Sequence, residues 1–288
     1  MIDLLFGPFG EFEFMRRALV GGVALALSGA PVGVFLILRR MSLTGDAMAH
    51  AILPGAALGY LVAGLSLGAM TIGGFIAGFL VAIMSGAVAR ATTLREDASL
   101  AGFYLISLAL GVTIVSLRGS SVDLMHVLFG NVLALDDPTL MLLAAISSLT
   151  LLGLATLYRA LVIETVDPMF FASVSHAGGI TQIAFLVLVV MNLVAGFQAL
   201  GTLLAVGIMM LPAASARLWT TNITRMIAIA SLIGVVSVYL GLVASYASGA
   251  PSGPMIILVA GGFHILSIIF GRTGGVIRAL RPRQHLEA

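Results

Sequence analysis

The chain has 288 residues, of which 60% are hydrophobic and only 9% are charged, and its formal net charge at pH 7 is +2. This composition excludes an ordinary soluble domain and predicts an all-α, polytopic transmembrane helical bundle. Cysteine is absent, which excludes disulfides, thiolate metal sites and cysteine nucleophiles.

Every basic residue is arginine, since the fourteen Lys and Arg positions contain no lysine. A P-loop ATPase needs a lysine that contacts the β- and γ-phosphates, so this chain cannot be one. We interpret the small excess of arginine as a topology signal and expect no nucleic-acid partner.

Nine apolar segments follow a short N-terminal stretch. Residues 1–14 carry Asp3, Glu11 and Glu13, the wrong charge for a cleavable signal peptide, and we expect them to lie at the membrane interface. Each later segment is about 20 residues long, enough to cross a bilayer. The segments are residues 15–38, 46–65, 67–90, 98–117, 138–161, 180–198, 200–218, 226–247 and 253–271. We treat residues 1–288 as a single transmembrane domain.

The arginine pattern predicts the orientation of these spans. With nine spans, most arginines fall on one side, which should be the cytoplasm. These are Arg39, Arg40, Arg90, Arg95, Arg159, Arg217, Arg225, Arg272, Arg278, Arg281 and Arg283. The N-terminus is then outside and the C-terminus is cytoplasmic. Arg16, Arg17 and Arg118 fall on the other side, and a count of eight spans stays open as the alternative.

The second segment begins with an acid and an imidazole that are four residues apart, Asp46 and His50. Four residues make one helical turn, so the two side chains share a face. An aspartate that faces lipid costs about 2.5–3.5 kcal/mol on insertion scales, so the pair should face protein or a water-filled path. One carboxylate and one imidazole suit a divalent metal such as Zn²⁺ or Mn²⁺. The alternative is a helix-start carboxylate beside an unrelated interfacial histidine.

Residues 118–137 form a connection that is too long for a simple turn. Asp123 and His126 in it are spaced i, i+3 and could receive a metal ion, although such residues more often cap a short helix. Asp136 and Asp137 precede Pro138, and we expect them to cap the fifth span.

The second long connection, residues 162–179, predicts a short interfacial helix. Asp167 would be its N-cap, Pro168 would be its first residue and Gly178 would close it.

Small and polar residues inside the spans predict contacts between helices. Gly55-x-x-x-Gly59 lets two helices approach closely. Asn192 and Gln198 should form interhelical hydrogen bonds. We interpret His264 as a hydrogen-bonded histidine of the bundle rather than as a metal ligand.

Four blocks of the sequence resemble one known family. They are Arg39 to Gly55 (RRMSLTGDAMAHAILPG), Ala199 to Ala216 (ALGTLLAVGIMMLPAASA), Asp123 to Ala134 and Pro251 to Pro254. In the order in which they follow along the chain, they resemble the membrane permease subunit of zinc, manganese and iron ABC importers, the metal-uptake ABC permease family.

The resemblance implies a multi-pass permease of the bacterial inner membrane that carries Zn²⁺, Mn²⁺ or iron and holds no covalent cofactor. It implies a second permease copy, separate cytoplasmic ATPase subunits and a periplasmic or extracellular metal-binding protein. Asp46 and His50 match the family's metal-path residues. The loop with Asp167, Phe170, Phe171, His176 and Gly178 resembles the ATPase-coupling region, although the family tends to have alanine at the position of Phe171.

Three other functions compete with this interpretation. A secondary metal transporter driven by protons usually needs several membrane-embedded acids, and few mid-span acids occur here beyond Asp46. A membrane metalloprotease needs an H-E-x-x-H helix, and a serine hydrolase needs a nucleophile of the G-x-S-x-G type with a histidine base; we expect neither in this chain. A purely structural bundle would leave Asp46 and His50 without a purpose.

Overall fold

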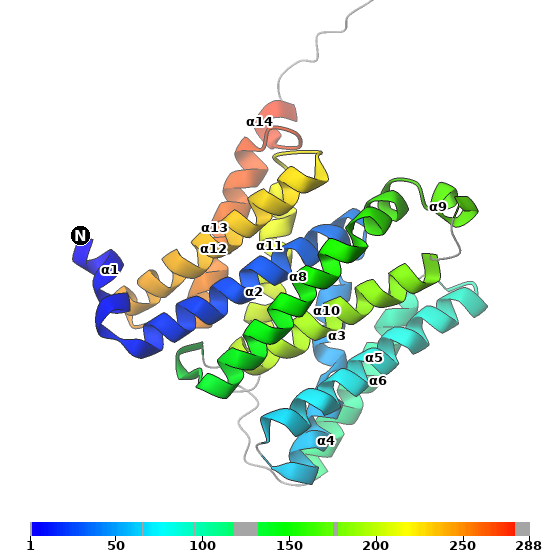
Figure 1. Ribbon diagram of the computed structural model, residues 1–288, viewed down its shortest axis with the longest axis horizontal. Coiled ribbons are helices and arrows are strands. Elements are labelled where there is room, and N and C mark those ends of the chain that lie inside the picture. Colours follow the sequence, from blue (N-terminus) through cyan, green and yellow to red (C-terminus); the bar gives the residue numbers. More distant parts are fainter. Residues whose placement is uncertain (1, 65, 95, 118–131, 175–177, 280–288) are drawn as a thin grey trace, which may run out of the picture.

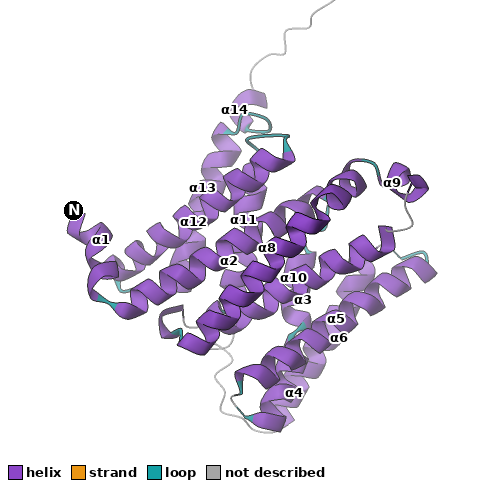
Figure 2. Cartoon of the chain, in the orientation of Figure 1, coloured by secondary structure: helices purple, strands orange, loops and turns teal. Residues whose placement is uncertain are grey.

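The computed structural model describes residues 2–64, 66–94, 96–117, 132–174 and 178–279. Within these ranges the chain is helical, with connecting turns and no strand, which confirms the all-α prediction (Figure 2). The helices are α1 (Ile2–Glu11), α2 (Glu13–Leu38), α3 (Thr44–Ala51), α4 (Leu53–Ala63), α5 (Leu67–Ala91), α6 (Glu96–Leu117), the 3₁₀ turn η1 (Val132–Ala134), α8 (Asp137–Val166), α9 (Pro168–Val174), α10 (Gly178–Leu200), α11 (Thr202–Arg217), α12 (Ile223–Ser248), α13 (Ser252–Phe270) and α14 (Val276–Ala279).

Each predicted apolar segment falls on a helix, except that residues 46–65 fall on the pair α3 and α4. In the described part of the chain, seven stretches are long and apolar enough to cross a membrane. The fourth and seventh predicted segments correspond to shorter apolar helices, Ala98–Ile114 and Thr202–Arg217. The polytopic bundle is therefore confirmed, whereas the count of nine spans and their orientation remain predictions.

Helix α2 lies at the centre of the bundle (Figure 1). It packs against α8, α10, α11 and α12. Helix α13 packs on α11 and α12 at one edge, and α4, α5 and α6 pack together at the opposite edge. Helix α3 contacts α5, α6, α10 and α11, so the short helix with the predicted metal residues is surrounded by four others.

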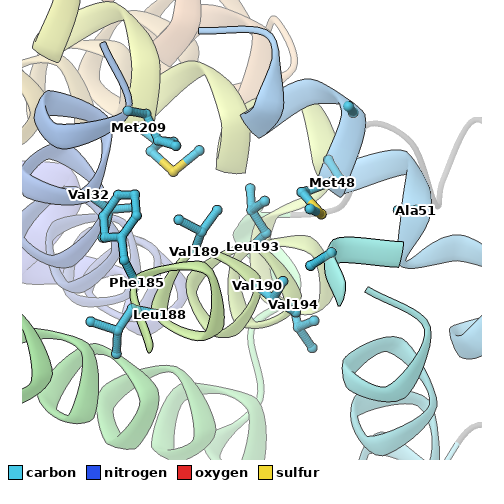
Figure 3. Close-up of a cluster of buried hydrophobic side chains, with 14 of the residues drawn as sticks. Val32, Met48, Ala51, Phe185, Leu188, Val189, Val190, Leu193, Val194 and Met209 are labelled. Atoms are coloured by element: carbon cyan, nitrogen blue, oxygen red, sulfur yellow. The ribbon is translucent and has the colours of Figure 1, made fainter. Parts of the chain in front are cut away.

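The largest buried cluster is built around α3 and α10 (Figure 3). Phe185, Val189 and Leu193 of α10 and Met48 of α3 are almost completely buried in it. Ala47, Ala49 and Ala51 of α3 are also buried in the cluster. Lipid chains are as apolar as these side chains, so this packing stabilises the bundle mainly through van der Waals contacts. The cluster holds α3 firmly against its neighbours.

The second predicted span is broken between α3 and α4. Pro54 lies in the first turn of α4, and its missing N–H interrupts the helical hydrogen bonding at the carbonyl of His50, four residues earlier and next to Ala51. The carbonyl oxygen of Ala51 accepts a hydrogen bond from the Ser107 hydroxyl of α6 at 2.9 Å. Within a membrane such a break needs a partner of this kind, because no lipid group can satisfy the backbone.

Glycines hold α4 against α5 and α6. A Cβ atom added to Gly55 would collide with the backbone of Gly73, and one added to Gly59 would collide with the backbone of Ala69. A Cβ at Gly111 would lie 3.0 Å from the Pro54 nitrogen. The predicted close approach at Gly55 and Gly59 is confirmed, and it joins α4 to α5.

The predicted interhelical hydrogen bonds are present. The Asn192 side-chain amide donates to the Ser28 hydroxyl at 2.7 Å. The Thr71 hydroxyl donates to Gln198 Oε1 at 2.7 Å. His264 Nδ1 lies 3.1 Å from the Ser215 hydroxyl, so this histidine connects α13 to α11.

Asp136 begins α8, as predicted. Its carboxylate accepts the backbone N–H of Thr139 at 3.1 Å. Hydrogen bonds from the side chain and backbone of Thr139 lower the pKa of Asp136 below its ordinary value. The neighbouring Asp137 forms an ion pair of 3.0 Å with Arg17, which ties α8 to the first turns of α2.

The ends of α2, α8 and α11 that carry arginine lie together. Arg39 forms an ion pair with Glu164 of α8, and Arg217 donates to the carbonyl of Ile37 at 3.3 Å. The segment after α13 joins them, since the backbone N–H of Thr273 donates to the carbonyl of Leu218 at 2.9 Å. These helix ends therefore share one end of the bundle, as the arginine pattern requires.

Candidate functional site

The chain turns from α2 into α3 through a residue with left-handed backbone. The Met41 N–H donates to the carbonyl of Leu36 at 2.9 Å, and the Arg40 N–H donates to that of Ile37 at 3.1 Å. This pattern ends a helix with one residue at positive φ, which is usually glycine. Here it is Arg40, with φ of 61°, and a side chain in this conformation costs about 1–2 kcal/mol. The turn directs α3 toward the interior of the bundle.

Asp46 and His50 lie one turn apart on α3. Asp46 Oδ1 and His50 Nε2 are separated by 3.7 Å. Metal–nitrogen and metal–oxygen bonds of about 2.1 Å can together span up to about 4.2 Å, so one ion could reach both atoms. The Asp46 side chain is 63% exposed and that of His50 is 26% exposed. The structure therefore brings together the two residues that the sequence predicts.

His50 is held by its surroundings. Its ring stacks on Tyr104 of α6, with ring centroids 6.5 Å apart and the ring planes inclined by 30°. Among the described residues, its buried Nδ1 atom has no hydrogen-bond partner. Nε2 is the ring nitrogen that faces Asp46.

A cavity of about 660 Å³ opens beside Asp46. The ends of α2, α3, α5, α6 and α10 line it, and its polar lining includes Arg39, Arg40, Asp46, Ser85, Tyr104 and Gln182. Asp46 and Tyr104 belong both to this cavity and to the surroundings of His50. Asp46 therefore borders a space that an ion and water can fill, whereas His50 is not among the residues that line it.

The donor set at this site is small. In the described ranges, no group of three or more His, Cys, Asp or Glu side chains could hold a metal ion. Two protein ligands bind a cation weakly, with water or other oxygen atoms completing its coordination. Weak binding suits a path along which an ion must enter and leave. Asp123 and His126, the other predicted metal residues, lie outside the described residues.

The predicted coupling region is a short helix between α8 and α10. Asp167 caps it as predicted, because its carboxylate accepts the Phe170 N–H at 2.9 Å. Phe170 is exposed, as is Met169, whereas Phe171 is buried. Met169 and Phe170 therefore give α9 an exposed apolar face, whereas the neighbouring Phe171 packs inward.

The predicted end of this helix at Gly178 is wrong. Helix α9 ends at Val174, and Gly178 begins α10, because the helical hydrogen bonding of α10 extends back through both glycines. His176 lies outside the described residues.

The sequence alone did not reveal an ion pair between distant residues. Arg39 Nη2 lies 2.6 Å from Glu164 Oε2, and the guanidinium carbon lies 4.8 Å from the centre of the Phe185 ring. The sequence indicates Arg39 only as a topology marker. A signal was present nonetheless, since both charges border long apolar runs and a charge there needs a partner.

The expectation that the chain has no G-x-S-x-G string is wrong, but the string that occurs does not form a hydrolase site. Residues 64–68 read Gly-Leu-Ser-Leu-Gly and so fit G-x-S-x-G. Ser66 is the N-cap of α5, and its hydroxyl oxygen accepts the Ala69 N–H at 3.5 Å. In the hydrolase motif the serine lies on a strand-to-helix turn, whereas Ser66 lies between the two helices α4 and α5. The glycine string therefore reflects a tight helical hairpin.

Comparison with known proteins adds independent information. The family ABC-3, the ABC 3 transport family, matches residues 11–271. The manganese import system permease protein ScaB of Streptococcus parasanguinis is 32% identical over 267 residues, which cover 93% of this chain and 94% of that protein. The manganese transport system membrane protein MntC of Halalkalibacterium halodurans is 31% identical over 281 residues, which cover 96% and 94%.

A solved structure has the same fold. The structure of PsaBC from Streptococcus pneumoniae in complex with Fab contains a chain that matches with a TM-score of 0.85 and 29% sequence identity. The match covers 98% of the present chain and 100% of that chain.

Proposed function

The chain belongs to the ABC 3 transport family, and we propose that manganese is the cargo that it carries across the membrane. The protein is a multi-pass protein of the bacterial plasma membrane and the permease subunit of an ATP-driven ABC importer for divalent metal. Manganese is favoured over zinc because the similar permeases from Streptococcus parasanguinis and Halalkalibacterium halodurans are named for manganese import. The oxygen and nitrogen donors of the site accept either ion.

Asp46 and His50 contact the cation during transport. The observation that carries this proposal is the 3.7 Å separation of their donor atoms, on a helix that four neighbours hold in place. The exposed carboxylate borders a cavity that is large enough for a hydrated ion. With the arginine-rich end of the bundle in the cytoplasm, the cation meets this pair late in its passage. The pair then acts as an inner gate or release site.

ATP is hydrolysed by a separate cytoplasmic subunit, which binds at α9. The exposed Met169 and Phe170 would contact it, while Asp167 caps the helix and the buried Phe171 holds it against the bundle. A second copy of the permease and an extracytoplasmic metal-binding protein complete the transporter. The nine-span arrangement, with the C-terminus in the cytoplasm, places α9 and the described ends of α2, α8 and α11 on the ATPase side.

Uptake of metal by the assembled transporter tests this function. The permease, the ATPase and the binding protein are reconstituted in proteoliposomes, and Mn²⁺ uptake is measured with Zn²⁺ as competitor. We expect uptake that requires ATP and persists when an ionophore removes the proton gradient. Uptake that requires the gradient and not ATP would support the secondary transporter instead. Zinc uptake without manganese uptake would contradict manganese as the cargo.

A further inference from the structure

We propose that Arg39 is a positioning residue that transmits movement between α9 and the helix that carries Asp46, through its ion pair with Glu164. This inference rests on the proposed function, because it assigns a role within the coupling of ATP hydrolysis to metal transport.

The ion pair is short and largely shielded from solvent. Arg39 Nη2 and Glu164 Oε2 are 2.6 Å apart, and only 10% and 19% of the two side chains are exposed. The guanidinium group also lies over the ring of Phe185 at 4.8 Å. Charge-assisted hydrogen bonds are stronger than neutral ones, and an aromatic face attracts a cation. Since separating buried charges is costly, the three side chains should move together.

Each partner lies next to a segment with a proposed role. Arg39 is the residue at which α2 ends, and the strained turn that follows it leads directly into α3. Glu164 lies in the last turn of α8, three residues before Asp167, which caps α9. Phe185 belongs to α10, the helix on the other side of α9. One guanidinium therefore connects both helices that flank α9 with the turn that sets the direction of α3.

The same arginine also borders the site. Arg39 and Asp46 both line the cavity of about 660 Å³. A shift of Glu164 that pulls on Arg39 would therefore change the turn, the cavity and the placement of Asp46 at once. An arginine that only stabilised the fold locally would not need to line the cavity.

Arg39 also has unused hydrogen-bonding capacity. Its Nε atom is buried and has no hydrogen-bond partner among the described residues. Buried donors are normally satisfied, and an exception needs an explanation. A second arrangement of the transporter in which Nε–H gains an acceptor would supply it, as expected of a residue that changes position during the cycle.

The test measures how many Mn²⁺ ions are transported per ATP hydrolysed, in proteoliposomes that contain the permease, its ATPase and the binding protein. Three changes are compared with the wild type: Arg39→Gln, Glu164→Gln and the reciprocal pair Arg39→Glu with Glu164→Arg. The matched control is Arg17→Gln, which breaks two surface ion pairs, with Glu13 and Asp137, at the opposite end of α2. Arg39→Lys keeps the positive charge but lacks the planar guanidinium group, and it is the conservative variant.

We expect each single neutral variant to hydrolyse ATP near the wild-type rate while the transport ratio falls at least about fivefold, the lower end of usual coupling between sites. The reciprocal pair or Arg39→Lys should recover part of the ratio, and Arg17→Gln should leave it unchanged. A ratio that stays constant while both activities fall together would overturn the inference, because it would indicate loss of folded protein only. If the wild type fails to transport Mn²⁺, the proposed function itself is wrong.

Discussion

The hydroxyl of Ser107 on α6 donates a hydrogen bond of 2.9 Å to the carbonyl oxygen of Ala51, at the point where α3 ends and α4 begins. This bond ties the break in the second span to a neighbouring helix. It lies one residue after His50, so it also helps to fix the end of the helix that carries the candidate metal residues.

Replacing Ser107 by alanine should leave the Ala51 carbonyl without its partner. A buried acceptor that loses its hydrogen bond costs about 1–3 kcal/mol. We expect the Ser107→Ala permease to unfold at a lower temperature in detergent and to transport metal more slowly. Thr113→Val is the control, because the Thr113 hydroxyl bonds to its own helix at the carbonyl of Ala109. Equal destabilisation by both changes would contradict a special role for Ser107.

Gly55→Ala should disrupt the contact between α4 and α5. The added methyl group would collide with the backbone of Gly73, which cannot rotate away. Overpacking usually costs about 1–3 kcal/mol, and a backbone collision should reach the upper end of that range. Thermal unfolding in detergent checks this. Gly102→Ala, at a helical position with open space beside it, should instead be neutral or slightly stabilising.

The backbone at Arg40 predicts an order of stabilities that does not depend on charge. Its φ of 61° suits glycine and strains any residue with a Cβ atom. Arg40→Gly and Arg40→Ala both remove the guanidinium, yet we expect the glycine variant to be more stable by about 1 kcal/mol. Unfolding of both variants in the same detergent measures the difference. An alanine variant as stable as the glycine variant would show that the turn relaxes.

Asp136 should make the start of α8 sensitive to acid. Hydrogen bonds from Thr139 lower its pKa in the folded protein, so the stabilisation is complete above the unfolded pKa and is lost as the pH falls through the folded pKa. The window therefore lies below the ordinary value of 3.8. At neutral pH, Asp136→Ala should cost about 1 kcal/mol, as for other N-caps. Unfolding from pH 7 to pH 3 should show the difference between wild type and variant shrinking in acid.

Much of the fold could be predicted because its signals are local. Apolar runs long enough to span a bilayer mark the helices, and Asp136 and Asp167 mark two helix starts through the residue types that cap helices. Asp46 and His50 could be paired because helical periodicity alone places them on one face.

The remaining features depend on contacts between distant residues. Local patterns give no sign that Arg39 meets Glu164, which lies 125 positions later. The break before Pro54 is stabilised by Ser107, which comes from another helix. Gly55 meets Gly73, which lies outside the predicted Gly55-x-x-x-Gly59 motif. Because such contacts are not visible in local patterns, Asp46 and His50 do not reveal which other groups complete the coordination of the ion.

Mn²⁺ uptake by the assembled transporter, with Asp46 and His50 both changed to alanine, measures whether these two residues contact the transiting cation. Glu13→Ala, at the opposite end of the bundle, is the control, and the amount of folded permease in the vesicles is matched by size-exclusion chromatography. We expect the double variant to lose at least about tenfold in uptake at low Mn²⁺, because metal ligation is impaired. Uptake by the double variant equal to that of the wild type would contradict it.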